Sequence, residues 1–241
     1  MTLAFDALDI SDSPLARLDP RWKLAALSLA ILITGFLQTL PAIFSALAIA
    51  VLMLAVARLP VRFLLWRYGA FVLFLMLFLV LLPITEGRQG LFAALRVGSR
   101  ALAIYSFGLV LLGTAPFATT IHAGQALGIP RPLTQITLMS YRYIFVLADE
   151  FSRIRLALRL RGFRNKMNRH SYRTVGNVTG ALLVRGADRA ERIGQAMRCR
   201  GFDGHFRTLY RFRTRRADVL LFAALMAAMG GIFAWDWYLR T

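Results

Sequence analysis

The chain has 241 residues, of which 58% are hydrophobic, and its mean hydropathy is +0.57. A soluble domain is usually about 45–50% apolar, so the composition indicates a membrane protein. The net charge of +18 would suggest nucleic-acid binding in a soluble protein, but in a membrane protein excess arginine is expected on the cytoplasmic side. The single cysteine, Cys199, excludes an intramolecular disulfide and a site with several cysteine ligands.

The first apolar block, about Leu24–Leu40, follows the sequence Asp19-Pro20-Arg21-Trp22-Lys23. Aspartate at the N-cap and proline at the first helical position predict a helix start. Trp22 is predicted to anchor the helix at the membrane interface, and Arg21 and Lys23 to flank it on the cytoplasmic side. Residues 1–19 carry four aspartates and no apolar core with basic flanks, so we expect no signal peptide.

Four further apolar blocks are expected to cross the membrane, where a helix needs about 20 residues. They are about Ala42–Ala57, Tyr68–Leu82, Ala101–Leu112 and Val219–Trp237. Pro41 predicts a tight turn, Pro83 marks the end of the third block, and Trp235, Trp237 and Tyr238 form an aromatic belt on the last. The less apolar segment Gly87–Arg100 is compatible with a surface helix.

Two segments leave the number of spans open at five or six. Pro130 and Pro132 break any helix within Phe117–Pro132. The segment Leu133–Ala148 is either an additional, polar-lined span or a helix packed on the others. The predicted fold class is therefore an all-α membrane protein with five or six transmembrane helices and long cytoplasmic amphipathic helices.

The region Asp149–Arg216 is too charged to enter lipid, and its positive charge places it in the cytoplasm. With a cytoplasmic N-terminus and four spans before this region, the C-terminus would lie outside, whereas a sixth span would move one terminus to the other side. The predicted domains are a transmembrane bundle (1–148), a cytoplasmic domain (149–216) and a C-terminal transmembrane helix (217–241).

An internal repeat lies inside the basic region. Residues 149–163 read DEFSRIRLALRLRGF and residues 188–202 read DRAERIGQAMRCRGF, aligned without a gap. The identical pairs are Asp149/Asp188, Arg153/Arg192, Ile154/Ile193, Ala157/Ala196, Arg159/Arg198, Arg161/Arg200, Gly162/Gly201 and Phe163/Phe202. The sequence therefore specifies one structural unit twice.

Each copy has the pattern of a helix with a sharp end. An aspartate precedes an arginine by four residues in both copies, a spacing that supports a helix by about 0.2–0.5 kcal/mol. An apolar stripe with helical spacing runs through Leu147, Phe151, Ile154 and Leu158. Each copy ends in Arg-Gly-Phe, where glycine suits the left-handed position that stops a helix and the dipole favours a cation. Twin arginine-bearing tips suggest a partner with two similar sockets.

An arginine-rich amphipathic helix is by itself typical of a membrane-surface helix held by anionic lipid. Attraction to lipid needs positive charge, but it does not need two copies in one register with matched stops. The repeat therefore favours a protein partner for the tips, with membrane lipid as a further partner.

The paired Arg-x-Arg-Gly-Phe tips resemble the paired X-Arg-X motifs of the transmembrane T components of energy-coupling factor (ECF) transporters. The segment Asp19–Leu24 resembles the Asp-Pro-Arg-x-Lys-Leu entry of that family. Four further elements resemble the cobalt-type members of the family, called CbiQ: Ile129-Pro130-Arg131, Tyr141-Arg142-Tyr143, Leu147 and Glu150. Nickel and vitamin members share much of this pattern. The resemblance covers most of the chain.

This resemblance implies a non-catalytic scaffold of the bacterial inner membrane, whose helix tips dock on two ABC-type ATPase subunits and move a substrate-binding membrane subunit, the S component. It implies no cofactor and no metal in this chain, because the S component holds the metal. The implied coupling residues are Leu160, Arg161, Gly162, Cys199, Arg200 and Gly201, to which the helix spacing adds Arg159 and Arg198. The implied N-terminal motif is Asp19, Pro20, Arg21 and Lys23. Leu160 and Cys199 replace the alanine of a plain tip.

Other classes of function have less support. The sequence has no phosphate-binding loop and no Ser-His-Asp or G-x-S-x-G pattern, and His122, His170 and His205 lie far apart, so neither an enzyme nor a metal site is expected. Aromatic residues interleave with arginines in the basic region, which would suit single-stranded RNA, but no nucleic acid is expected as a partner. These aromatic residues are Phe163, Tyr172, Phe202, Phe206, Tyr210 and Phe212. The cluster Arg207–Arg216 is interpreted as a cytoplasmic flank of the last span.

Overall fold

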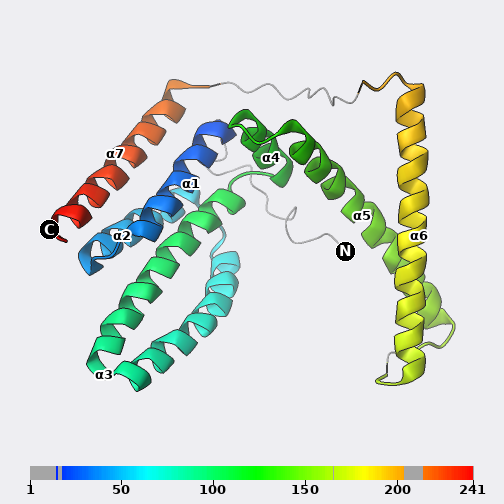
Figure 1. The fold of residues 1–241 in the computed structure, drawn as a ribbon, viewed down its shortest axis with the longest axis horizontal. Coiled ribbons are helices and arrows are strands. Elements are labelled where there is room, and N and C mark those ends of the chain that lie inside the picture. The colour runs from blue at the N-terminus through cyan, green and yellow to red at the C-terminus, as the bar shows by residue number, and fades with distance from the viewer. Residues whose placement is uncertain (1–14, 16–17, 165, 204–213, 241) are drawn as a thin grey trace. The chain divides into compact units, whose positions relative to one another are not determined.

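The computed structural model describes residues 15, 18–164, 166–203 and 214–240, and these are helical with short connections (Figure 1). His205 and most of the basic cluster Arg207–Arg216 lie outside the described residues. The chain divides into two compact units, Met1–Ile129 with Phe212–Thr241, and Pro130–Arg211. We call the first the membrane unit and the second the helix-pair unit. The functional division at residues 148 and 216 stays a prediction.

The membrane unit contains α1 (Pro20–Phe36), α2 (Leu40–Ala57), α3 (Val61–Gly113), α4 (Phe117–Ala126) and α7 (Arg216–Tyr238). Within the described residues, four helical segments are long and apolar enough to cross a membrane. They are Leu40–Ala57, Arg62–Ile84, Gly87–Gly113 and Arg216–Tyr238. The predicted first span is α1, which is apolar but has only 17 residues. The chain is thus an all-α membrane protein.

The α3 helix consists of two candidate spans that meet at a kink at Gly87. Gly87 has φ 60° and ψ −132°, which only glycine adopts easily, so the chain direction changes there. The second candidate span is one helix over Gly87–Gly113, so Gly87–Arg100, which the sequence leaves compatible with a surface helix, belongs to the same helix as the predicted block Ala101–Leu112. Small residues explain the difference, since the side chains of Ala94 and Ser99 are buried while the arginines of this stretch lie on other faces.

The junction of α1 and α2 also differs from the prediction. The α1 helix begins at Pro20 as predicted, but it ends at Phe36, and α2 begins at Leu40. Pro41 therefore lies in the first turn of α2 rather than in a tight turn between helices. Backbone N–H groups in the first turn of a helix have no partner within the helix, so a proline there costs no hydrogen bond.

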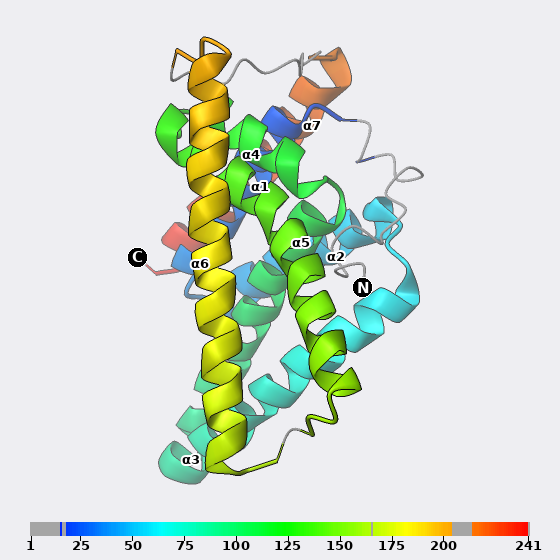
Figure 2. The ribbon, with the colours of Figure 1, turned by 90° about the vertical axis from the view of Figure 1, so that its right-hand side faces the viewer.

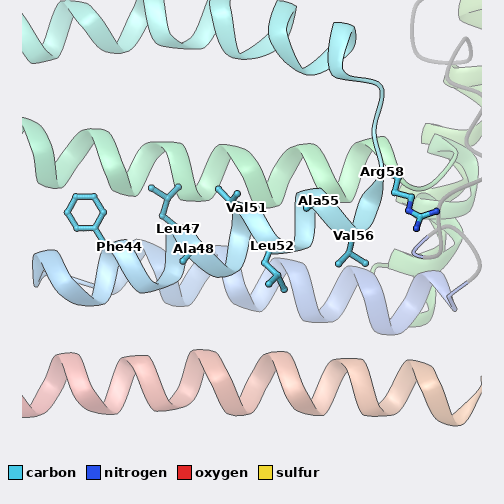
Figure 3. Close-up of a pocket in the computed structure, with 8 residues that line it drawn as sticks. All are labelled: Phe44, Leu47, Ala48, Val51, Leu52, Ala55, Val56 and Arg58. Carbon is cyan, nitrogen blue, oxygen red and sulfur yellow. The ribbon is translucent and has the colours of Figure 1, made fainter.

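The core of the membrane unit is built from small side chains, which let helices approach closely in lipid. Its fully buried members include Ala26, Ala30, Ala42, Ala46 and Ala50, with Leu225 and Met229 from α7. Another face of α2 carries an apolar hollow of about 860 Å³ (Figure 3). The residues that line it are Phe44, Leu47, Ala48, Val51, Leu52, Ala55, Val56 and Arg58.

A buried carboxylate links the end of α7 to the junction of α1 and α2 within the membrane unit. The carboxylate of Asp236 in α7 accepts the N–H groups of Gln38 and Thr39 and the hydroxyl of Thr39, just before α2. Arg240 contacts the same carboxylate and donates to the carbonyl of Phe36 at the end of α1. Arg100 donates to the carbonyl of Leu37. This cluster supplies partners to the backbone groups that the α1–α2 junction leaves without helical bonds.

The helix-pair unit consists of α5 (Arg131–Leu160) and α6 (Arg169–Cys199). The segment Leu133–Ala148 is the first part of α5, and α5 is not among the helices apolar enough to span a membrane. The structure therefore gives no support to an additional span here and shows one helix that continues into the first repeat copy, while packing of this segment on the other helices stays a prediction. Pro130 is the N-cap of α5 and Pro132 lies in its first turn, so the prolines separate α5 from α4. The segment Phe117–Pro132 nevertheless contains the helix α4, because Phe117–Ala126 ends before Pro130.

Candidate coupling site at the helix tips

The first repeat copy ends its helix with a specific backbone arrangement. The α5 helix ends at Leu160, and the N–H of Gly162 donates to the carbonyl of Arg159 over 3.0 Å. The N–H of Phe163 donates to the carbonyl of Leu158, also over 3.0 Å. These two bonds define a Schellman motif, which needs a left-handed residue, and Gly162 supplies it with φ 77°.

The second copy repeats this arrangement. The α6 helix ends at Cys199, the N–H of Gly201 donates to Arg198 over 3.0 Å, and the N–H of Phe202 donates to Met197 over 3.1 Å. Gly201 has φ 72°. The helix stops predicted from Arg-Gly-Phe are thus confirmed in both copies.

Arg161 and Arg200 occupy the same position in the two motifs, directly before the left-handed glycine. Both are exposed. The exposed residues that surround them are Arg159, Leu160, Arg198 and Cys199. Because the Schellman motif fixes where the helix ends, each arginine projects from the last position that the helix holds firmly. That these residues contact a partner stays a prediction.

Replacing Gly162 or Gly201 by alanine is expected to weaken the last helical turn by about 1 kcal/mol, because a left-handed backbone is strained for a residue with a Cβ. The amide hydrogens of Phe163 or Phe202 should then exchange about fivefold faster, as measured by hydrogen exchange.

The matched control is Gly176→Ala inside α6, where the backbone is helical. A Cβ added at Gly162, Gly176 or Gly201 would meet no atom within 4 Å beyond the local chain, so packing does not distinguish the three positions. The control should slow exchange nearby, since alanine favours a helix over glycine. Equal behaviour of the three variants would contradict the role assigned to the glycines.

The two helices cross at a shared carboxylate. Glu150 of α5 pairs with Arg185 at 3.1 Å and with Arg189 at 3.3 Å on α6. Close approach is possible at Gly186, where an added Cβ would lie 3.9 Å from the Leu147 side chain. Figures 1 and 2 show that α5 and α6 run in opposite directions, so their C-terminal tips lie at opposite ends of the pair.

This crossing joins equivalent positions of the repeat. The copies are offset by 39 residues (188 − 149), and the same offset relates Glu150 to Arg189 and Leu147 to Gly186. Contact between equivalent positions is characteristic of two-fold symmetry, in which residue i of one copy meets residue i of the other. The two copies are therefore related by an approximate two-fold rotation about the crossing.

The two tips are equally far from the crossing. Arg161 follows Glu150 by eleven positions (161 − 150), and Arg200 follows Arg189 by eleven positions (200 − 189). At 1.5 Å per residue each arm is about 16 Å long. The tips thus lie on opposite sides of the crossing, up to about 33 Å apart along the helix axes.

The sequence also predicts ion pairs inside each copy. Asp149 and Arg153 form such a pair at 3.0 Å, which confirms the prediction for the first copy. The corresponding pair of Asp188 and Arg192 stays a prediction.

The N-terminal motif forms a buried cluster within the membrane unit. Asp19, 4% exposed, accepts the N–H of Arg21 and the hydroxyl of Thr214, each over 3.1 Å. Asp218, 2% exposed, accepts the N–H of Asp19 over 3.1 Å and that of Arg215 over 2.6 Å. The starts of α1 and α7 thus share two carboxylates, which helix N-termini favour.

Lys23 completes this cluster from α1. It is 3% exposed and donates to the carbonyls of Leu15 over 3.3 Å and Thr114 over 2.9 Å. The sequence did not predict that this ammonium group is buried where α3 ends, while the cytoplasmic side of Lys23 stays a prediction. Trp22 packs edge-on against Phe222 of α7, with ring centroids 5.2 Å apart.

Sequence reasoning missed the partners of these residues. Asp218 directly precedes the last apolar block and Asp236 lies within it, and an ionisable residue in a membrane span is itself a signal of a specific role. Their partners are about 200 residues away in the chain, so no local pattern identifies them.

The histidines do not gather in the described part of the chain. His122 lies in α4 and His170 in α6. Among the described residues, no three His, Cys, Asp or Glu side chains are grouped so that they could hold a metal ion. The prediction that the chain holds no metal is not tested by this and stays a prediction.

Comparison with known proteins gives consistent matches. The cobalt transport protein CbiQ of Rhodobacter capsulatus is 31% identical over 121 residues, which are 50% of this chain and 49% of that protein. The cobalt transport protein CbiQ of Salmonella typhimurium is 31% identical over 120 residues (49% and 52%). An uncharacterised protein of Methanocaldococcus jannaschii is 26% identical over 147 residues (60% and 50%). The chain spans about half the length of the curated relatives it matches.

A family model described as CbiQ, cobalt transport protein, matches residues 11–210. This range contains the N-terminal motif, both repeat copies and the crossing between them. The match covers most of the chain, which therefore belongs to the CbiQ family of cobalt transport proteins and is a multi-pass membrane protein.

Proposed function

We propose that this chain is the transmembrane coupling subunit of an ECF-type importer. In this role it transmits the motion of two ABC-type ATPase subunits to a separate substrate-binding membrane subunit. The observation that carries the proposal is the crossing of α5 and α6 at equivalent repeat positions, which gives two arms of equal length. Two similar tips on opposite sides of an approximate two-fold axis suit two copies of one partner.

Arginine suits the contact at each tip. Its planar fork donates two parallel hydrogen bonds to a carboxylate, and it remains charged when a partner partly buries it. The exposed Leu160 and Cys199 beside Arg161 and Arg200 add apolar surface. An acidic groove with an apolar wall on each ATPase subunit would complement such a tip.

The crossing provides a pivot for the motion. The ion pairs of Glu150 are partly exposed, and pairs of this kind contribute only about 0–1 kcal/mol each. A change of the crossing angle therefore costs little, whereas each arm is a continuous helix that transmits displacement. When the ATPase subunits close on ATP, the tips move toward each other, and the helix pair passes this change to the membrane-embedded partners.

Cobalt is the proposed substrate, because the family and two of the relatives are described as cobalt transport proteins. A nickel or vitamin importer would use the same scaffold. In this proposal the substrate-binding subunit holds the substrate, so the identity of that subunit determines what is imported.

The test is the composition of the complex purified from its native membrane in mild detergent and weighed by native mass spectrometry. We expect two ATPase subunits per chain together with one small membrane protein. Arg161→Ala or Arg200→Ala alone should lower the ratio of ATPase to chain toward one, because each variant impairs one of two sockets. Recovery of the chain without any ATPase, under conditions that preserve other membrane complexes, would contradict the proposal.

A further inference from the structure

The turn that follows the first tip carries two unusually exposed apolar side chains. Met167, just before α6, is 91% exposed, and Tyr172 in its first turn is 68% exposed. They flank a hollow of about 360 Å³, which is lined by Lys166, Met167, Ser171, Tyr172 and Val175. A methionine and a tyrosine that protrude beside a hollow can insert into the surface of a partner and receive one of its side chains in return.

This surface is held in place by its own contacts. The backbone N–H of Lys166 donates to the hydroxyl of Ser171 over 3.2 Å, and Ser171 is buried. The ring of Phe163, which belongs to the first tip, packs against His170 with centroids 6.3 Å apart. Both contacts fasten the connection between the helices to the start of α6, so the surface is pre-organised for binding.

The surface adjoins the first tip, whose Phe163 packs against His170, and it carries one sign of charge. Leu160 is 82% exposed and lies only a few residues before Met167. From Glu150 to Asp188 the chain contains arginines and a lysine but no acidic residue between these two positions. An acidic partner is therefore favoured here and a basic one is repelled.

We propose that Met167, Tyr172 and the hollow between them extend the docking site of the first tip on its ATPase subunit. This inference rests on the proposed function and adds apolar anchors to the contact made by Arg161. Methionine and tyrosine are enriched where protein interfaces are fully buried, and a side chain of a folded partner fills a hollow. The partner at this tip is thus a protein surface with an acidic patch beside a protruding apolar side chain.

The test places a photo-crosslinking residue in the full chain in its native membrane. Tyr172→p-benzoylphenylalanine probes the proposed surface, Leu160→p-benzoylphenylalanine probes the tip, and Leu183→p-benzoylphenylalanine is the control. Leu183 is a matched position, since it is 69% exposed on the same helix but lies away from the hollow. Mass spectrometry then identifies what each probe captures.

We expect the Tyr172 and Leu160 probes to capture the same polypeptide, one that contains a phosphate-binding loop, and the Leu183 probe not to capture it. If the Leu160 probe captures this polypeptide while the Tyr172 probe captures only lipid or nothing, the extended docking site is wrong and the proposed function stands. If neither probe captures such a polypeptide, the proposed function fails as well.

A pair of serine variants measures the strength of the contact. Met167→Ser with Tyr172→Ser should raise the dissociation rate of the ATPase subunit at the first tip at least about tenfold, because a few anchoring side chains dominate the binding energy of an interface. Leu183→Ser should leave the rate unchanged. An unchanged rate in the double variant, with the chain folded and inserted, would overturn the proposal.

Discussion

Replacing Arg161 and Arg200 together by glutamate is expected to abolish binding of both ATPase subunits while the chain remains inserted in the membrane. Each change removes a cation from a helix C-terminus and places an anion opposite the expected acidic groove, and like charges in contact cost several kcal/mol. Affinity for each subunit should fall at least about a hundredfold. Co-purification from membranes and substrate uptake by intact cells measure the effect.

The control for this variant keeps the same change in net charge. Arg155 and Arg192 are exposed arginines of the same two helices that lie before the tips. Replacing both by glutamate alters the overall field equally but spares the docking positions, so most of the binding should remain. If this control loses the ATPase subunits as completely as the tip variant does, general electrostatic attraction explains the binding and the tips have no special role.

The second large effect is expected at Asp236, which is 1% exposed. Asp236→Ala removes the acceptor for the N–H groups of Gln38 and Thr39 and leaves Arg240 without its carboxylate. Leaving a buried hydrogen-bond donor without its acceptor costs about 1–3 kcal/mol, and the carboxylate of Asp236 accepts from two N–H groups and one hydroxyl. The melting temperature of the purified chain in detergent should fall on the order of 10 °C, as measured by size-exclusion chromatography after heating.

Two further variants test whether the loss of stability comes from the carboxylate of Asp236. Asp236→Asn keeps the shape and one accepting oxygen, so its loss of stability should be clearly smaller. Leu220→Ala truncates a side chain that is 69% exposed on the same helix and should change the melting temperature little. A loss for Leu220→Ala that equals the loss for Asp236→Ala would show that α7 tolerates no truncation, and the specific role of the carboxylate would be refuted.

Local chemistry explains which features could be predicted from the sequence. Asp19 and Pro20 start α1 as expected, and Gly162 and Gly201 stop their helices as expected, because capping depends on residues only a few positions apart. The span that begins at Gly87 has no comparable local signal in the sequence. Arg88 and Arg96 lower the local hydropathy, although the small residues between them allow a 27-residue span.

Long-range pairing could not be predicted. The repeat shows that two similar helices exist, but only the structure shows that they meet at Glu150 and Arg189, and therefore that their arms are equal. The neighbours of Lys23 predict a cytoplasmic flank of the first span, but they do not predict its partners, which are the carbonyls of Leu15 and of Thr114, a residue 91 positions away. Such contacts depend on packing between spans, which leaves no periodic signal in the sequence.

The carboxylates at the two ends of α7 have a consequence for how the protein sits in lipid. Asp218 ties the start of α7 to the start of α1, and Asp236 ties its end to the residues just after α1. Eighteen residues separate the two carboxylates (236 − 218), or about 27 Å of helix, close to the thickness of a bilayer's hydrocarbon core, about 30 Å. Helices fastened at both ends cannot slide past one another, so a thicker or thinner bilayer must tilt the pair together or deform around it.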